Sequence, residues 1–442
     1  MSKHVLILGA GLVSQPIIDY LFNKTDFNLT VADISEENAQ KAINGNSRGQ
    51  VATLDVNDSK NLRHLVSESD LVVSLLPYTL HSIVAKHCLA AGKSMVNASY
   101  VSDEMRAFDG EAREKGLLFL CEMGLDPGLD HMSAMQIIHD IRKRGGKIKE
   151  FVSVCGGLPA PEANTNPFGY KFSWSPKGVL LAGKSSARYI ENGTVKVVAA
   201  DDLFHSTTSM TIDGRDFEAY PNRDSTSYED SYGFKNIDLL LRGTLRYPGW
   251  HEYIITFEAL NLLKDSPIAP GMTSLAEVLG DLNDLDSENI RHSIASKLEL
   301  PESSNVIQAL EWLGLFNQDI FDCEGTTAID LLAGLMSKKM AYDEGERDMV
   351  ALEHRFKASF PDHLESITST LVDYGIPRGD SSMSRTVSLP VAIVVKLILE
   401  GKVDLTGVRI PIDPIIYEPV LKELKTLGIK FKEDVKKNRI AV

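Results

Sequence analysis

The chain has 442 residues, 43% hydrophobic and 24% charged, with a net charge of −15. This length allows two or three domains, and the acidic balance argues against nucleic-acid and membrane partners. The four scattered cysteines and the spacing of the eleven histidines predict neither disulfides nor a metal site. Because the N-terminus shows no signal segment, a cytoplasmic location is expected.

The first part of the chain alternates short apolar runs with helical patterns. Strands are expected at "HVLIL", "LTVAD", "QVATLDV", "DLVVSLLP", "SMVNAS" and "LLFLCEMG", with helices between them. Strands and helices in this alternation predict an α/β fold with a doubly wound parallel sheet. We therefore expect a Rossmann dinucleotide-binding domain over residues 1–126.

A glycine-rich loop, "GAGLVS", joins the first expected strand to the first expected helix. Gly9 and Gly11 match the dinucleotide fingerprint, in which glycines allow a tight turn and close approach of the pyrophosphate. Ser14 takes the third position, where the pattern prefers glycine or alanine. We predict that Leu12 and Val13, together with these three residues, contact a dinucleotide.

An acidic residue, Asp33, ends the second expected strand. A carboxylate there accepts hydrogen bonds from the adenosine ribose of NAD, whereas capping of the next helix is the alternative role. From Asp33 to Gln40 the charged residues are all acidic, including Glu36 and Glu37. An NADP enzyme usually supplies an arginine here, so the sequence favours NAD, with Ile34 as a neighbouring contact and NADP as the alternative.

Two further loops follow expected strands and face the cofactor in this interpretation. Asp55 and Val56 come after the third strand, where an adenine ring normally lies, and Leu75 comes after the fourth. A turn or cap is an equally good role for Asp55.

The pattern changes after about residue 147. "KIKEFVSVCGG", "TVKVVAA" and "DFEAYPNRD" predict a mixed or antiparallel sheet, and "EYIITFEALNLLK", "SNVIQALEWLGLF" and "AIDLLAGLMSKKM" predict helices. A last strand, "HLESITSTLVDYG", and two helices near the C-terminus follow. We expect an α/β substrate-binding and dimerisation domain over 127–255 and 352–442, with a helical domain, 256–351, inserted. Part of the C-terminal segment is expected to lie on the Rossmann domain.

Seven motifs in this order carry a family resemblance: "SLLPY", "GLDPGLDH", "CGGLPAPE", "GYKFSWSPKGVLLA", "YPNRDS", "RGTLRY" and "EGERDMV". From residue 4 to the C-terminus the chain resembles saccharopine dehydrogenase of the L-glutamate-forming type. The resemblance implies an NAD(P)-dependent homodimer that cleaves saccharopine oxidatively to L-glutamate and 2-aminoadipate 6-semialdehyde.

The same resemblance implies roles for individual residues. The substrate contacts would be Ser99, Tyr100, Asp126, Arg223, Thr244, Leu245 and Arg246, with the arginines as carboxylate clamps. Further cofactor contacts would be Leu125, Asp126, Pro127 and Trp174. For proton transfer the candidates are Asp126, then Tyr100, then Cys155. Each has a simpler alternative: charge attraction for Asp126, hydrogen bonding alone for Tyr100, and packing for Cys155. A cap or core role is expected for His131.

One departure from the family concerns the cofactor. Fungal biosynthetic members carry an arginine-containing "CRT" where this chain has "ADI", and they use NADP. Asp33 therefore favours NAD and the lysine-degrading direction. The alternatives are an NADP-dependent saccharopine reductase of lysine biosynthesis and a carboxynorspermidine dehydrogenase-like enzyme. A nucleotide-bound regulator without activity is a third, against which the combination of Asp126, Tyr100, Arg223 and Arg246 argues.

Overall fold

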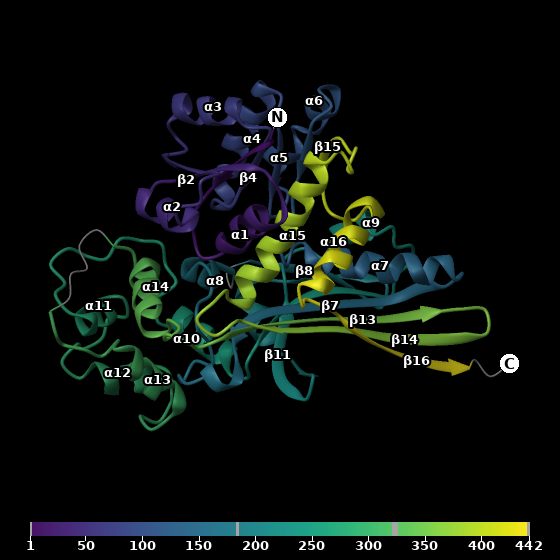
Figure 1. The fold of residues 1–442 in the computed structure, drawn as a ribbon. Helices are drawn as coiled ribbons and strands as arrows, with labels where there is room; N and C mark the ends of the chain where they lie inside the picture. Colours follow the sequence, from purple (N-terminus) through teal and green to yellow (C-terminus); the bar gives the residue numbers. More distant parts are fainter. Residues whose placement is uncertain (1, 183–184, 321–325, 440–442) are drawn as a thin grey trace. The chain divides into compact units, whose positions relative to one another are not determined.

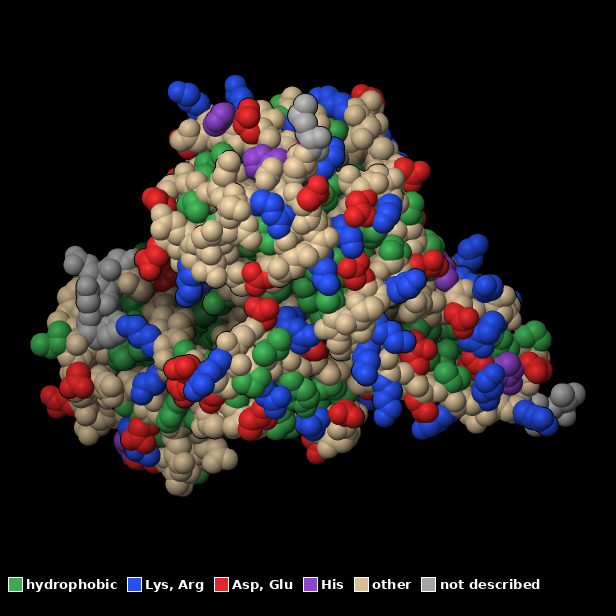
Figure 2. Space-filling model, in the orientation of Figure 1, with side chains coloured by type: hydrophobic (Ala, Val, Ile, Leu, Met, Phe, Trp, Pro, Cys, Tyr) green, Lys and Arg blue, Asp and Glu red, His purple; other side chains and the backbone are tan. Residues whose placement is uncertain are grey.

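The structure, a computed structural model, describes residues 2–182, 185–320 and 326–439 (Figure 1). By its internal contacts the chain divides into two compact units. Unit 1 consists of Met1–Ile148, Asp230–Gly233 and Phe356–Val442, and unit 2 of Lys149–Glu229 and Phe234–Arg355. On the face drawn in Figure 2, acidic and basic side chains are interspersed, so the net charge of −15 is not gathered in one patch there.

Unit 1 contains a parallel sheet in the order β15-β6-β5-β4-β1-β2-β3. Its strands are β1 (His4–Leu8), β2 (Asn28–Asp33), β3 (Gly49–Thr53), β4 (Leu71–Ser74), β5 (Ser94–Asn97), β6 (Leu118–Leu120) and β15 (Gly407–Arg409). In register, Val5 of β1 lies beside Leu29 of β2 and Leu71 of β4. The doubly wound sheet is confirmed, and its strand order changes direction between β1 and β4, where such sheets bind ligands.

Helices cover this sheet and complete unit 1. They are α1 (Gln15–Lys24), α2 (Glu36–Ile43), α3 (Ser59–Glu68), α4 (His81–Ala91), α5 (Asp103–Arg106), α6 (Asp109–Glu114), α7 (Leu129–Lys143), α15 (Ser382–Leu399) and α16 (Pro414–Thr426), with a short 3₁₀ turn, η1 (Tyr78–Leu80). The charged segment between β5 and β6 forms two short helices, α5 and α6. The C-terminal segment adds β15 at the sheet edge, and α15 packs against α1.

One helix among the described residues, α15, is long and apolar enough to span a membrane by length and composition, with a mean hydropathy of 1.5. Within the structure 72% of it is buried, and it contacts α1, α7 and α16. The hydroxyl of Ser388 also donates to the carbonyl of Val13 in the glycine loop. These are the features of a core helix.

Unit 2 contains most of a mixed sheet, with the order β10-β11-β12-β7-β13, in which β8 pairs with β12 and β9 with β8. The strands are β7 (Lys147–Pro159), β8 (Ala187–Glu191), β9 (Thr194–Val198), β10 (Thr208–Ile212), β11 (Arg215–Pro221), β12 (Leu239–Arg246) and β13 (Asp348–Ser359). β12 runs parallel to β7 and antiparallel to β11. In unit 1, β14 (His363–Tyr374) pairs antiparallel with β16 (Lys432–Arg439), and every residue of β16 is exposed.

Unit 2 also contains helices and short 3₁₀ turns. They are η2 (Pro161–Ala163), α8 (Pro176–Ala182), η3 (Ala200–Ser206), α9 (Ser227–Ser231, which extends into the unit 1 segment), α10 (Trp250–Ala259), α11 (Leu275–Asp281), α12 (Ile290–Lys297), α13 (Asn305–Leu313) and α14 (Ala328–Lys339). Helices α11 to α14 follow one another in contact (Figure 1). The division by contacts places 127–148 in unit 1 and the helical region in unit 2, so the expected three-domain division stays a prediction.

Candidate functional site

The glycine loop lies at the carboxyl end of β1, between β2 and β4. Gly9 has φ +102°, and a Cβ there would lie 3.1 Å from the carbonyl oxygen of Leu75, so only glycine fits without strain. Its N–H donates to Ala32 O over 2.8 Å. A Cβ on Gly11 would meet nothing within 4 Å, which leaves open space beside the loop for a ligand.

The loop leads into the N-terminus of α1, where backbone N–H groups favour a phosphate. Ser14 stands at the N-cap without a side-chain capping bond to the described helix, because its hydroxyl donates to Gly11 O over 2.8 Å. The side chain of Leu12 is 71% exposed. An uncapped helix N-terminus with an apolar side chain beside it fits a dinucleotide.

Asp33 ties the glycine loop to the end of β2. Its carboxylate accepts from the N–H of Ala10 over 2.7 Å and from the N–H of Ser35 over 2.8 Å. The side-chain cap of α2 is Ser35, whose hydroxyl accepts from Asn38 N. Beside it, Ile34 is 75% exposed. Asp33 is therefore not the side-chain N-cap of α2, which was its alternative role.

The next two loops differ in how they face the cofactor edge. Leu75 lies directly against Gly9. Asp55 accepts from the backbone and side-chain amides of Asn57 over 2.9 and 3.0 Å, which is turn geometry, and Val56 is buried in the core of unit 1. Of these three predicted contacts, the structure places Leu75 beside the glycine loop.

The loops after β5 and β6 bring two of the catalytic candidates together. The hydroxyl of Tyr100 donates to Oδ1 of Asp126 over 3.0 Å, and both side chains are partly buried. Leu125 and Pro127, on either side of Asp126, are buried. A carboxylate and a phenol in direct contact can share or pass a proton.

A buried network supports these loops. Glu122 has φ +60°, and its carboxylate accepts from Val101 N over 3.0 Å. It also lies 2.7 Å from Nε2 of His131, whose Nδ1 lies 2.6 Å from the hydroxyl of Tyr232. His131 has no exposed surface, which agrees with its expected core role. The sequence did not point to Glu122, because its partners are distant along the chain.

A second histidine, His81, also escaped the sequence analysis. Its Nδ1 lies 2.9 Å from Oγ of Ser74 at the end of β4, and its Nε2 lies 2.8 Å from Oγ of Ser99 after β5. Burial lowers the pKa of His81 to about 4, so the ring is neutral at pH 7. Its position directly after "SLLPYTL", at the start of a helix, was the available signal.

In unit 2, Arg246 on β12 is buried in an aromatic cluster. Its guanidinium lies over the rings of Tyr170, at 4.9 Å, and Trp250, at 5.7 Å. Nη1 donates to Leu245 O over 2.7 Å, but Nε is buried without a hydrogen-bond partner among the described residues. The hydroxyls of Tyr170 and Tyr342 are also buried without a hydrogen-bond partner among the described residues. A buried cation surrounded by unused donors is suited to a carboxylate ligand.

The remaining predicted residues of unit 2 fall into two groups. Cys155 is buried and lies in register with Thr244. Leu245 is wholly buried, and its carbonyl accepts from Arg246. Arg223, with φ +51°, is exposed in the turn after β11, and Trp174 is partly exposed before α8.

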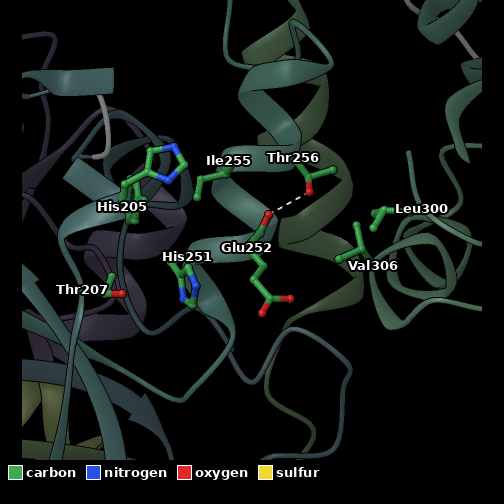
Figure 3. Close-up of a pocket in the computed structure, with 9 residues that line it drawn as sticks. His205, Thr207, His251, Glu252, Ile255, Thr256, Leu300 and Val306 are labelled. Atoms are coloured by element: carbon green, nitrogen blue, oxygen red, sulfur yellow. Dashed lines mark hydrogen bonds between the residues drawn. The ribbon is translucent and has the colours of Figure 1, made fainter. Parts of the chain in front are cut away.

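A cavity of about 400 Å³ opens in unit 2 beside α10 (Figure 3). It is lined by Phe204, His205, Thr207, His251, Glu252, Ile255, Thr256, Leu300 and Val306. None of the predicted site residues is among them, so this cavity is not the predicted site. Within the part of the chain that is described, no cluster of His, Cys, Asp and Glu could hold a metal ion.

Comparisons with known proteins identify the family of the chain. Residues 5–120 match the family model "Saccharopine dehydrogenase NADP binding domain", and residues 124–429 match "Saccharopine dehydrogenase C-terminal domain". The "Saccharopine dehydrogenase [NADP(+), L-glutamate-forming]" of Saccharomyces cerevisiae is 40% identical over 98% of this chain and 99% of the relative. The mitochondrial alpha-aminoadipic semialdehyde synthase of Bos taurus is 36% identical over 97% of this chain and 47% of its own length.

A solved structure extends the likeness to the fold. The apo saccharopine dehydrogenase (L-Glu forming) of Saccharomyces cerevisiae matches with a TM-score of 0.89 and 39% identity, over 98% of this chain and 100% of that one. The chain therefore belongs to the saccharopine dehydrogenase family of lysine metabolism, whose members are nicotinamide-dependent oxidoreductases acting on the CH–NH group of donors.

Proposed function

We propose that this enzyme oxidises L-saccharopine with NAD to L-glutamate, 2-aminoadipate 6-semialdehyde and NADH, in the direction of lysine degradation. The observation that carries the proposal is the contact of Tyr100 with Asp126 at the carboxyl edge of the first sheet, the edge that bears the glycine loop. A cytoplasmic homodimer is part of the proposal and rests on sequence arguments and the family resemblance alone.

The chemistry requires a base, an acid and anchors for three carboxylates. Bound NAD would accept the hydride from the carbon beside the secondary amine. Asp126 is proposed to take the proton of the amine so that its lone pair can form the imine, and Tyr100 to orient that carboxylate. Water then adds to the imine carbon and releases one proton, and the glutamate nitrogen takes the proton held by Asp126, directly or through Tyr100. The carbon–nitrogen bond breaks as the new hydroxyl loses its proton, which leaves the aldehyde.

Anchoring of the substrate is assigned, following the family resemblance, to arginine and hydroxyl side chains. Arg246, buried and without a carboxylate partner among the described residues, is proposed to bind one carboxylate, and exposed Arg223 another. The hydroxyls of Ser99 and Thr244 are proposed to bind substrate oxygens. Cys155, buried beside Thr244, is the third candidate for proton transfer.

The choice of NAD rests on Asp33 and its acidic neighbours. The first turn of α2 carries Glu36 and Glu37, and Arg48, the first arginine after Asp33, is engaged by the carbonyls of Phe22, Thr25 and Phe27. A 2′-phosphate beside Asp33 would approach an acidic segment, because residues 33–40 include no lysine or arginine. The second candidate cofactor is NADP, favoured by the names of the relatives and of the matching domain.

The test is kcat/KM for NAD and NADP, with saccharopine, of the wild type and of Asp33→Arg. We expect a preference for NAD of at least about tenfold, equivalent to about 1.4 kcal/mol, which the substitution narrows or reverses. Asp26→Arg, shortly before the start of the same strand, makes the same charge change and should leave the preference unaltered. Equal or better use of NADP by the wild type would move the biosynthetic reductase to first place.

If neither cofactor supports turnover of saccharopine, the substrate assignment is wrong. Carboxynorspermidine-type substrates are then the next to be tried with the same protein. Tight NADH binding without turnover of either substrate would instead indicate a nucleotide-bound regulator.

A further inference from the structure

The hydroxyl of Ser99 is oriented by a chain of hydrogen bonds that crosses two strand ends. Ser74 Oγ lies 2.9 Å from Nδ1 of His81, and Nε2 of His81 lies 2.8 Å from Ser99 Oγ. The backbone of Ser99 is held separately: its N–H donates to Asn97 Oδ1 over 2.9 Å, and its carbonyl accepts from Glu122 N over 3.0 Å. His81 therefore acts on the hydroxyl alone.

The direction of this chain follows from the burial of Ser74. Ser74 has no exposed surface, and His81 is the hydrogen-bond partner of its hydroxyl among the described residues. A buried hydroxyl hydrogen without an acceptor is costly, so Ser74 donates to Nδ1. A neutral imidazole carries one N–H, and it must then be on Nε2, where it donates to Ser99.

We propose that Ser74 and His81 are positioning residues that make the Ser99 hydroxyl a one-way hydrogen-bond donor towards an acceptor oxygen of the substrate. Because Ser99 Oγ accepts from His81, its own hydrogen points elsewhere, and a carboxylate oxygen is the ligand group that it suits. The inference rests on the proposed function in one respect, that Ser99 contacts the substrate.

The test separates the two nitrogens of His81. In His81→Gln the amide N–H reaches the place of Nε2 and keeps the bond to Ser99, whereas in His81→Asn the shorter amide reaches only the place of Nδ1. We expect KM for saccharopine to rise about tenfold in His81→Asn and in Ser99→Ala, and less than about threefold in His81→Gln, with KM for NAD unchanged. His87→Asn, on the same helix beside the exposed Ser59, is the matched control and should behave as wild type.

A double-mutant cycle and a spectrum complete the test. The variant His81→Asn/Ser99→Ala should have the same KM as Ser99→Ala, because His81 acts through that hydroxyl. A ¹H–¹⁵N spectrum of the free enzyme should place the hydrogen of His81 on Nε2. Additive effects, a hydrogen on Nδ1, or an unchanged KM in Ser99→Ala would each overturn the proposal. Wild-type turnover of saccharopine tests the proposed function separately, and the spectrum needs no turnover.

Discussion

The carboxyl edge of the first sheet and the cluster around Arg246 differ in how their polar groups are satisfied. At the sheet edge, Asp33 accepts two backbone N–H groups and Asp126 accepts the hydroxyl of Tyr100. Around Arg246, the guanidinium Nε and the hydroxyl of Tyr170 are buried without hydrogen-bond partners among the described residues. Such groups are rare in native proteins and call for an explanation.

This difference indicates two strategies of ligand binding. The sheet edge is preorganised, since its side chains are held in place by each other before any ligand arrives, and this suits groups that must meet a reacting atom at a set distance. The Arg246 cluster is completed by its ligand, since a carboxylate would satisfy donors that are unused in the free protein. Substitution of the proton-transferring residue at the first should therefore lower kcat, and substitution of the arginine at the second should change KM and stability.

The largest effect is expected from Asp126→Asn. Loss of the carboxylate that accepts the amine proton should lower kcat about 100- to 1,000-fold, measured from NADH absorbance at saturating substrate. Asp130→Asn is the control in the same motif, because Asp130 accepts from Gly128 N over 2.6 Å inside the loop. This control substitution should lower the melting temperature of the enzyme and leave kcat close to that of the wild type. A higher KM with an unchanged kcat in Asp126→Asn would contradict the comparison between the two regions.

Arg246→Met should separate stability from binding. We expect kcat/KM for saccharopine to fall about 100-fold, or about 2.7 kcal/mol, as for a buried charged anchor. The melting temperature of the free enzyme should rise, because a buried guanidinium whose Nε has no hydrogen-bond partner among the described residues is replaced by an apolar side chain of similar length. Arg242→Met, on the same strand, should instead lower it, since Arg242 donates to the hydroxyl of Tyr228 over 2.6 Å. A drop in melting temperature for Arg246→Met would indicate that its donors are satisfied in the free protein.

The sheet edge should also show a pH dependence of stability through His81. Burial lowers its pKa from 6.5 to about 4, so between these values the unfolded chain binds a proton that the folded protein does not. Stability is therefore full above pH 6.5 and falls by about 3 kcal/mol as the pH drops to 4. Urea unfolding of His81→Gln should lose this part of the pH dependence, whereas a variant of the exposed His64, His64→Gln, should retain it.

The smallest effect is expected from Ser35→Ala, which removes the side-chain cap of α2. The free energy of unfolding should fall by about 1 kcal/mol, as measured by urea denaturation, while the ratio of kcat/KM for NAD and NADP should stay the same. If the ratio changed as much as in Asp33→Arg, cofactor choice would depend on the position of α2 rather than on the carboxylate of Asp33.

The sequence predicted the strands whose pattern of apolar residues reflects their burial. β1, β2 and β4 are apolar on both faces, which gives short apolar runs, and the loops between them carry recognisable glycine and acidic residues. β16 has a charged sequence, "KEDVKKNR", and is exposed throughout, so no hydrophobic period marks it. β15 is three residues long and is defined only by its pairing with β6.

The candidate site was predictable where residue type and strand end coincide, as for Gly9, Asp33 and Asp126. Roles that depend on contacts between residues distant in the sequence were not predictable. His81 and Glu122 act through residues that follow other strands, and those contacts cannot be read from the local sequence of either residue. The buried Nε of Arg246 could not be predicted from the sequence either, because its lack of a hydrogen-bond partner among the described residues depends on the three-dimensional packing.

The position of β15 has a consequence for the order of events during translation. The edge of β6 is covered by Gly407–Arg409, and α1 is covered by α15. The sheet of unit 1 is thus completed only after most of unit 2, which lies between β6 and β15 in the sequence, has been made. Until then a parallel strand edge and the apolar surface of a helix are exposed, and both favour association with other chains. Nascent chains should therefore expose both surfaces while unit 2 is being synthesised.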